Sequence, residues 1–166
     1  IKINEKGKVL DYKSICKSLD GSCYIYLKDK NDTETIEKIK SLIVNLPIDF
    51  ILEGKEIRDA GGDEEASLMI EASLDYYFVD DIYGEVIDEI KDEEVGVKPH
   101  RHKATHGYSP KKENYTTFFI GSGRGFKKGV VIDKGNLINH GPTLAKILGL
   151  KFKDIDGEAV EEILNI

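Results

Sequence analysis

Residues 20–53 read DGSCYIYLKDKNDTETIEKIKSLIVNLPIDFILE, and this stretch decides the fold. Aromatic and branched residues dominate Ser22–Lys28 after a turn, a pattern that is typical of a strand. Asp32 then begins a helix in which isoleucine and leucine recur at helical spacing until Pro47 ends it. A second short strand is expected over Asp49–Glu53. The order strand, helix, strand predicts a small mixed α and β unit.

The same unit extends further along the chain. Glu56–Ala60 is expected to be a helical turn that two glycines stop, and strands are expected at Ser67–Ala72 and Asp75–Val79. After Pro99 the character of the sequence changes, because His100–Pro110 is polar and rich in histidine. We therefore expect a loop there, between the first α+β unit and a second region.

The second region also shows element signals. Thr116–Ile120 is strongly apolar and predicts a strand, and Val130–Ile132 predicts a shorter one. Pro142 lies just inside the start of a predicted helix, and Gly149 lies where that helix should stop. A last amphipathic helix is expected over Ala159–Leu164.

The composition bounds the class of protein. The chain has 166 residues, of which 40% are hydrophobic and 33% charged, as expected of one globular domain of ordinary size. No apolar run approaches the roughly 20 residues of a membrane-spanning helix. The start lacks a basic-then-apolar leader, so no secretory signal is seen and the cytoplasm is expected. It also lacks a methionine, which indicates a processed N-terminus or a piece of a longer chain.

Charge is distributed unevenly along the chain. Residues 53–94 hold sixteen acids and three bases, whereas residues 98–153 hold twelve bases and two acids. One interpretation is two solvated surfaces that attract each other, and the other is a basic region that faces an anion such as a phosphate. Nucleic acid is not expected as a partner, because the net charge is −7 and the lysines do not alternate with aromatic residues.

Two cysteines are present, Cys16 and Cys23, and their spacing matches neither a disulfide framework nor a zinc ribbon. We expect both to be reduced thiols. Cys23 lies within the predicted strand Ser22–Lys28 and should belong to the core, where cysteine behaves as a small apolar residue.

The strongest chemical signal is a histidine-rich loop. His100, His102 and His106 lie close together, and imidazole is a common metal ligand. His102 and His106 have the spacing that would chelate on a helix, but Pro99 and Pro110 make a helix there unfavourable. From spacing alone, a metal site and a solvated loop both stay open.

Two other features are weaker candidates. Gly121–Gly125 follows a predicted strand but fits neither G-x-G-x-x-G nor the P-loop, so we interpret it as a turn rather than a phosphate-binding loop. Thr105 stands beside His106 and is the one notable hydroxyl nucleophile candidate, although adjacency in sequence is not evidence of contact.

An ordered series of short motifs resembles a known family. The motifs are Thr105–Pro110, Phe118–Gly123, Gly125–Gly129, Gly141–Ala145, Leu148-Gly149 and Asp156-Gly157. In this order they resemble the C-terminal end of bacterial type I phosphodiesterase/nucleotide pyrophosphatase proteins, which belong to the alkaline phosphatase superfamily. Gly21–Leu27 is similar to the strand that begins the family's inserted cap, so the resemblance covers roughly residues 18–166.

The resemblance implies a metal-dependent hydrolase that cleaves phosphate ester bonds, usually with two zinc ions and a threonine or serine nucleophile. The expected substrate is a phosphodiester or nucleotide. In the family the histidine of the HGY motif is a metal ligand, which maps onto His106 alone. Ligation would make the imidazole neutral, with its second ring nitrogen oriented by a partner group.

The family's other ligands and its nucleophile have no match here. The chain has no Asp-His dipeptide, no aspartate four residues before any histidine, and no threonine before Thr33. One ligand cannot hold a catalytic zinc, which normally has three protein ligands. The resemblance therefore implies a C-terminal portion whose catalytic residues lie in a missing N-terminal part of the same protein, and which is inactive alone.

The implied fold is α/β: the C-terminal part of an alkaline-phosphatase-like α/β sandwich with an α+β cap subdomain. Residues 1–17 would be a connector, residues 18–95 the cap, and residues 96–166 the end of the catalytic domain. Without its neighbours, the exposed sheet edge would promote self-association. The competing class is a non-catalytic phosphate- or metal-binding module. A phosphoglycerate mutase or a sulfatase of the same superfamily is disfavoured by the HGY-x-P and fKkG motifs.

Overall fold

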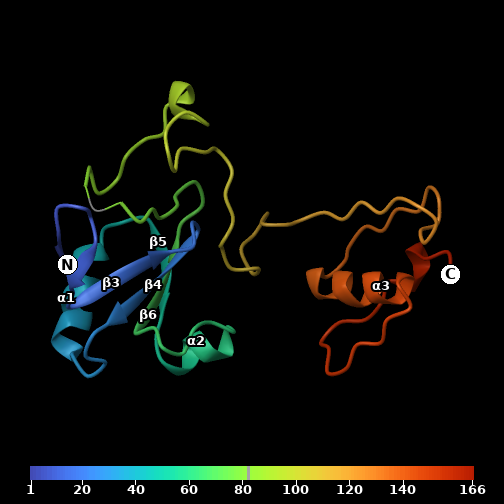
Figure 1. The fold of residues 1–166 in the computed structure, drawn as a ribbon, viewed down its shortest axis with the longest axis horizontal. Helices are drawn as coiled ribbons and strands as arrows, with labels where there is room; N and C mark the ends of the chain where they lie inside the picture. The colour runs from blue at the N-terminus through green and yellow to red at the C-terminus, as the bar shows by residue number, and fades with distance from the viewer. Residues whose placement is uncertain (82) are drawn as a thin grey trace. The chain divides into compact units, whose positions relative to one another are not determined.

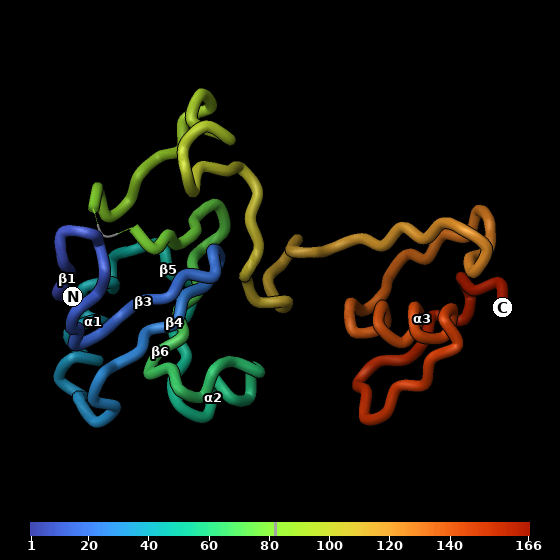
Figure 2. The backbone as a smooth tube through the Cα atoms, viewed as in Figure 1, coloured from blue at the N-terminus to red at the C-terminus, as the bar shows by residue number. Residues whose placement is uncertain are grey.

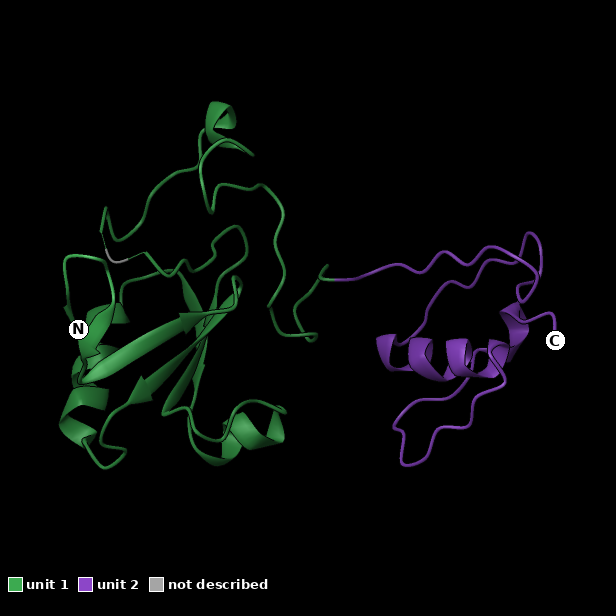
Figure 3. Cartoon of the chain, in the orientation of Figure 1, with its two compact units in different colours: residues 1–115 green, residues 116–166 purple. Residues whose placement is uncertain are grey.

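The computed structural model describes residues 1–81 and 83–166 and divides into two compact units, residues 1–115 and residues 116–166 (Figure 3). Mixed α and β structure, as predicted, is present. The elements in chain order are β1 (Lys2–Ile3), β2 (Val9–Asp11), β3 (Ser14–Ser18), β4 (Ser22–Leu27), α1 (Thr33–Ile43), β5 (Ile48–Leu52), α2 (Lys55–Asp59), β6 (Leu68–Ala72), η1 (Asp92–Glu94), η2 (Leu137–Asn139), α3 (His140–Ile147) and η3 (Glu161–Ile163).

The first unit is built on a four-stranded sheet with the order β3-β4-β6-β5 (Figure 1). Each neighbouring pair is antiparallel, and β1 and β2 form a separate short hairpin. The central strands β4 and β6 are the most buried, because they have a strand on either side and apolar residues that alternate toward one face.

The core lies between this sheet and α1. Cys23, Ile25, Leu68 and Ile70 form its buried centre, and the isoleucines of α1 pack against them. The helix begins where the sequence predicts, because the Asp32 carboxylate accepts hydrogen bonds from the backbone N–H and the hydroxyl of Thr35. The predictions for β4, α1, β5, α2 and β6 are confirmed to within two residues, apart from the end of α1.

The predicted strand Asp75–Val79 is wrong. Asp75 has a left-handed backbone with φ of 71°, which turns the chain out of the direction of β6. The segment then binds the turn after β3 instead of a sheet ladder: the Phe78 N–H donates to the Asp20 carbonyl at 2.8 Å, and the Ser18 hydroxyl donates to the Phe78 carbonyl.

The second unit, residues 116–166, is centred on α3. Pro142 lies in its first turn and Gly149, with φ of 69°, lies just past its end, as predicted. Thr143 is buried, donates to the Asn139 carbonyl at 2.6 Å and accepts from the Val160 N–H at 3.0 Å. This hydroxyl therefore ties the C-terminal segment to the helix.

The strands predicted at Thr116–Ile120 and Val130–Ile132 are absent from the structure. The backbone runs without regular structure from residue 116 to the turn that precedes α3, apart from an isolated bridge between Phe126 and Leu164 (Figure 2). A strand needs a neighbour for its backbone groups, and no described segment of this unit ladders with either stretch.

The predicted final helix Ala159–Leu164 is also wrong, since only the single turn η3 forms there. Its backbone groups bind other segments instead. The Lys127 N–H donates to the Ile163 carbonyl at 2.8 Å, and the Asn165 N–H donates to the Gly125 carbonyl at 2.9 Å. Among all described residues, no helix combines the length and the apolar character needed to cross a membrane.

Candidate functional site

The histidine loop docks against the turn between β3 and β4. The Gly21 N–H donates to the His106 carbonyl at 2.8 Å. Gly107 follows with φ of 87°, and a Cβ added there would lie 1.8 Å from the Leu19 carbonyl oxygen. Only glycine fits at this position, both for its backbone conformation and for the close approach of the two chains.

Tyr108 completes the docking from the other side of the turn. A Cβ added at Gly21 would lie 2.5 Å from Cγ of the Tyr108 ring, so the ring lies directly on the glycine. The Tyr108 hydroxyl donates to the Tyr76 carbonyl at 2.6 Å, and the Tyr115 ring meets the Tyr108 ring edge-on at 5.3 Å. The backbone of the HGY motif is therefore held on both flanks.

Asp20 is the polar centre of this arrangement. Its backbone is left-handed, with φ of 63°, a conformation that Asp tolerates better than most residues. Its Oδ2 accepts the Thr105 hydroxyl at 2.8 Å and lies 3.6 Å from Nε2 of His106. Asp20 is thus the group that faces one ring nitrogen of His106.

The His106 ring itself is free to meet other groups. Its side chain is 81% exposed, although the His106 carbonyl and the two residues that follow are held against the turn. Thr105, in contrast, has its hydroxyl proton committed to the Asp20 carboxylate. The structure therefore places Thr105 as an anchor of the loop.

A buried ion pair fixes the continuation of the loop. Glu71 on β6 has an exposed fraction of 0%, and its Oε2 accepts the Ser109 N–H at 2.6 Å. Its Oε1 lies 3.2 Å from the Lys112 ammonium, and makes no hydrogen bond to a described group. The ammonium is 7% exposed and also binds the Ala72 carbonyl at 2.7 Å and Asp49 at 2.5 Å. We call these three charged residues the clamp.

The clamp shifts the pKa values of Asp49 and Lys112. The hydrogen bond from Lys112 is the main reason that the pKa of Asp49 lies below its usual value, and a second hydrogen bond from Ser73 adds to it. Burial alone would lower the pKa of Lys112, but pairing with Asp49 and Glu71 outweighs burial and raises it. Asp49 and Lys112 are thereby held in their charged forms around neutral pH.

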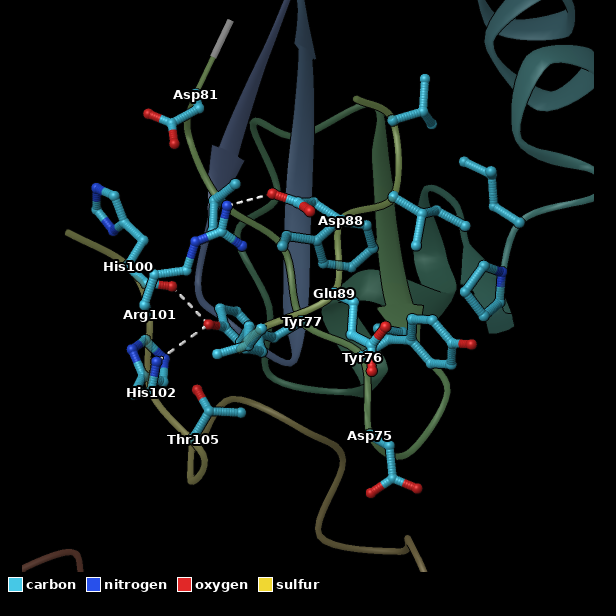
Figure 4. A pocket seen from close by; sticks show the side chains of 18 of the residues that line it. Asp75, Tyr76, Tyr77, Asp81, Asp88, Glu89, His100, Arg101, His102 and Thr105 are labelled. Carbon is cyan, nitrogen blue, oxygen red and sulfur yellow. Dashed lines mark hydrogen bonds and ion pairs between the residues drawn. The ribbon is translucent and has the colours of Figure 1, made fainter. Parts of the chain in front are cut away.

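His100 and His102 lie elsewhere, at a cavity of about 1180 Å³ (Figure 4). The His102 ring stacks on the Tyr77 ring, with 4.5 Å between centroids and 16° between planes. The Tyr77 hydroxyl donates to the His100 carbonyl and accepts from the His102 N–H at 3.4 Å. The structure therefore uses these histidines to organise the loop beside Tyr77, and does not bring them to His106.

The acidic and basic regions also form ion pairs with each other. Arg101 pairs with Asp88, as Figure 4 shows, while Lys98 pairs with Glu94 at 2.5 Å. Lys103 also pairs with Asp92. These three pairs join the end of the acidic region to the start of the basic region, which agrees with attraction between the two within residues 88–103. The alternative, a phosphate facing the basic region, stays a prediction.

Residues 1–81 and 83–166 contain no group of three or more His, Cys, Asp or Glu side chains that could hold a metal ion. His106 has one neighbouring carboxylate, on Asp20. His102 and His106 both lie in loop, as Pro99 and Pro110 predict, so they do not form a helical chelate. These residues alone do not fit a zinc centre.

The glycine-rich turn of the second unit has a packing role. A Cβ at Gly121 would strike the Phe126 ring at 2.6 Å, and one at Gly125 would strike Ile147 at 2.7 Å. Gly123 has φ of 117°. No helix follows this turn directly, which agrees with its interpretation as a turn rather than a phosphate-binding loop.

Comparison with known proteins gives no relative: no family model, no curated protein and no solved structure matches the sequence.

Sequence reasoning missed Asp20, Glu71 and Lys112 as site residues. Asp20 was visible only as the first residue of an Asp-Gly turn. Glu71 offered the clearer signal, because it is a lone acid inside the apolar strand β6 and so requires a partner. Its partner Lys112 is 41 positions distant in the numbering and could not be chosen from among the lysines without the structure.

Proposed function

We propose that this chain is the C-terminal portion of a metal-dependent phosphodiesterase/nucleotide pyrophosphatase, and that His106 is one of its metal ligands. The observation that carries the proposal is the combination of a fixed backbone and an exposed imidazole at His106. The Gly21 N–H, the close approach at Gly107 and the Tyr108 ring hold the main chain, yet the ring is 81% exposed.

This combination suits a ligand in a shared site. A metal ligand must be held within a fraction of an ångström before the ion arrives, which a docked backbone provides. The Oδ2 of Asp20, 3.6 Å from Nε2, supplies the carboxylate that commonly orients a ligating imidazole. When bound, a pair of zinc ions would stabilise the attacking and leaving oxygens of the phosphate ester.

The remaining ligands and the nucleophile would come from an N-terminal part of the same protein. The family resemblance supports this source, and the lack of a three-ligand group among the described residues agrees with it. It follows that residues 1–166 alone should not hydrolyse a phosphodiester.

The finer fold is part of the same proposal. We assign residues 96–166 to the end of an alkaline-phosphatase-like α/β sandwich and residues 18–95 to its cap. Thr116–Ile120 supports this assignment: Phe118 and Ile120 are 81% and 82% exposed, while Phe119 packs against Phe126 and His140. A segment that is apolar on both sides is typical of a strand in a parallel sheet covered on both faces.

The test uses the intact gene product that contains this sequence, supplied with zinc and a chromogenic phosphodiester. His106→Ala should lower kcat/KM by at least about 100-fold and should remove bound zinc measured by mass spectrometry. The matched control is His100→Ala, in the same loop but outside the docked motif, which should keep activity within about twofold. Equal activity in His106→Ala and the parent protein would overturn the proposal. Tight zinc binding without hydrolysis in the parent protein would instead support a non-catalytic metal-binding module.

A further inference from the structure

The two cysteines, which the proposed function does not use, are neighbours across the β3–β4 hairpin. Ser18 pairs with Cys23 and Cys16 pairs with Ile25 in the strand register. Because side chains alternate along a strand, Cys16, Ser18, Cys23 and Ile25 project from the same face. Cys16 and Cys23 are therefore diagonal neighbours on adjacent antiparallel strands.

The two thiols differ in access. Cys23 is 2% exposed and belongs to the core, whereas Cys16 is exposed on β3, at the edge of the sheet. A small oxidant in solution can therefore reach Cys16 first. Cys23 is shielded from it but has Cys16 as its neighbour across the hairpin.

Their mutual contact also makes them chemically unequal. The neighbouring Cys23 thiol is the main influence that lowers the pKa of Cys16, and Lys17 adds to it, while burial and the Asp80 carboxylate oppose it. The same contact, followed by burial, raises the pKa of Cys23. Cys16 is thus the better thiolate, and thiolates are the reactive form.

We propose that Cys16 and Cys23 form a redox modification site that a hydrogen peroxide molecule converts into a disulfide. The Cys16 thiolate attacks one peroxide oxygen, so that an S–O bond forms, the O–O bond breaks and hydroxide leaves. The Cys23 sulfur then attacks the sulfenic sulfur: the S–S bond forms, the S–O bond breaks, and the departing hydroxide takes the Cys23 proton as water. Peroxide is reduced by two electrons and the two thiols are oxidised.

The position of β3 makes closure feasible. Diagonal neighbours in a sheet are about 7–8 Å apart, slightly more than the roughly 4.4–6.8 Å between Cα atoms of a disulfide, so one strand must shift. β3 is an edge strand that pairs with β4 alone in its sheet, so a small slide of β3 along β4 would disturb one ladder only. The bond would span the hairpin immediately before the Asp20 turn, onto which the His106 segment docks.

The experiment oxidises the reduced full chain with stoichiometric hydrogen peroxide and follows the intact mass under denaturing conditions. The expected product is a monomer lighter by two hydrogen atoms, restored by dithiothreitol, and formed at least about tenfold faster than in the urea-unfolded chain. Cys16→Ser should abolish this product, and it should fold normally because Cys16 is exposed. In Cys23→Ala, dimedone should trap a sulfenic acid on Cys16.

Three results would overturn the proposal: no loss of two hydrogens in the native chain, a rate no faster than in the unfolded chain, or disulfide-linked dimers as the main product. Because none of these readouts involves zinc or phosphodiester hydrolysis, the proposal and the proposed function can fail independently.

Discussion

Gly107 has the most restricted position in the candidate site. Its φ of 87° and the 1.8 Å approach that a Cβ would make to the Leu19 carbonyl act together, whereas Gly61, with φ of 74°, has nothing within 4 Å of its added Cβ. Alanine substitutions at the two glycines can therefore distinguish the free-energy cost of the backbone conformation from that of a steric clash.

Gly107→Ala should release the docked loop, with a cost of about 3 kcal/mol to the bound conformation. The measurement is hydrogen exchange at the Gly21 amide, whose bond to the His106 carbonyl should break, so that exchange becomes faster. Gly61→Ala, the control, should cost about 1 kcal/mol and leave that amide protected. Unchanged protection in Gly107→Ala would contradict the docking.

The clamp is the second feature at the residue scale, because Glu71 is fully buried and depends on Lys112. Lys112→Met should lower the free energy of unfolding by about 3 kcal/mol, since it leaves an unpaired buried charge. Glu71→Gln together with Lys112→Met should recover more than half of that loss. Urea unfolding of the unmodified chain, the two single variants and the double variant gives the coupling free energy between Glu71 and Lys112. Strictly additive changes in the free energy of unfolding would show that the two residues are independent.

The pH dependence of the clamp follows from the shifted pKa values. The pKa of Asp49 is lowered, so its contribution is present above the ordinary value of about 4 and is lost as pH falls through the lower native value. The pKa of Lys112 is raised, so its contribution is present below about 10.5 and is lost as pH rises through the higher native value. The free energy of unfolding, measured as a function of pH, should fall less on acidification in Lys112→Met than in the unmodified chain. An identical acid slope in both proteins would contradict the pairing with Asp49.

At the scale of elements, the sequence predicts those parts whose partners are local. β4 and α1 carry their own signals, in alternation, helical spacing and the Asp32 cap. The segments at residues 75–79 and 116–120 have the same apolar composition as strands, but pairing depends on a distant neighbour that no local pattern reports. The site divides in the same way: His106 is visible in the sequence, whereas Glu71 and Lys112 become partners only in the fold.

Thr116–Ile120 allows a test of whether its exposed apolar side chains promote self-association of the chain. Phe118 is exposed and Phe119 packs on Phe126, so the two neighbouring phenylalanines form a matched pair. Phe118→Ser should reduce self-association of the chain in sedimentation velocity and leave the Tm within about 2 °C, because it removes exposed apolar surface alone. Phe119→Ser should lower the Tm instead. Equal self-association in Phe118→Ser and the unmodified chain would show that Phe118 does not contribute to the self-association surface.

At the scale of the whole molecule, the sheet unit carries the histidine loop and the clamp, while the second unit carries α3 and much exposed apolar surface. His106 has a held backbone and an exposed ring, and the described residues contain no three-ligand group, as we expect of one portion of a shared metal site. We therefore propose that His106 acts in a phosphodiesterase only together with residues outside this sequence.

The most direct measurement compares zinc-dependent hydrolysis of a chromogenic phosphodiester by residues 1–166 and by the intact gene product. We predict no turnover by residues 1–166 above an enzyme-free zinc control, and turnover by the intact protein that His106→Ala reduces by at least about 100-fold. Zinc-dependent turnover by residues 1–166 that disappears in His106→Ala would mean that this chain holds a complete site, and would contradict the account.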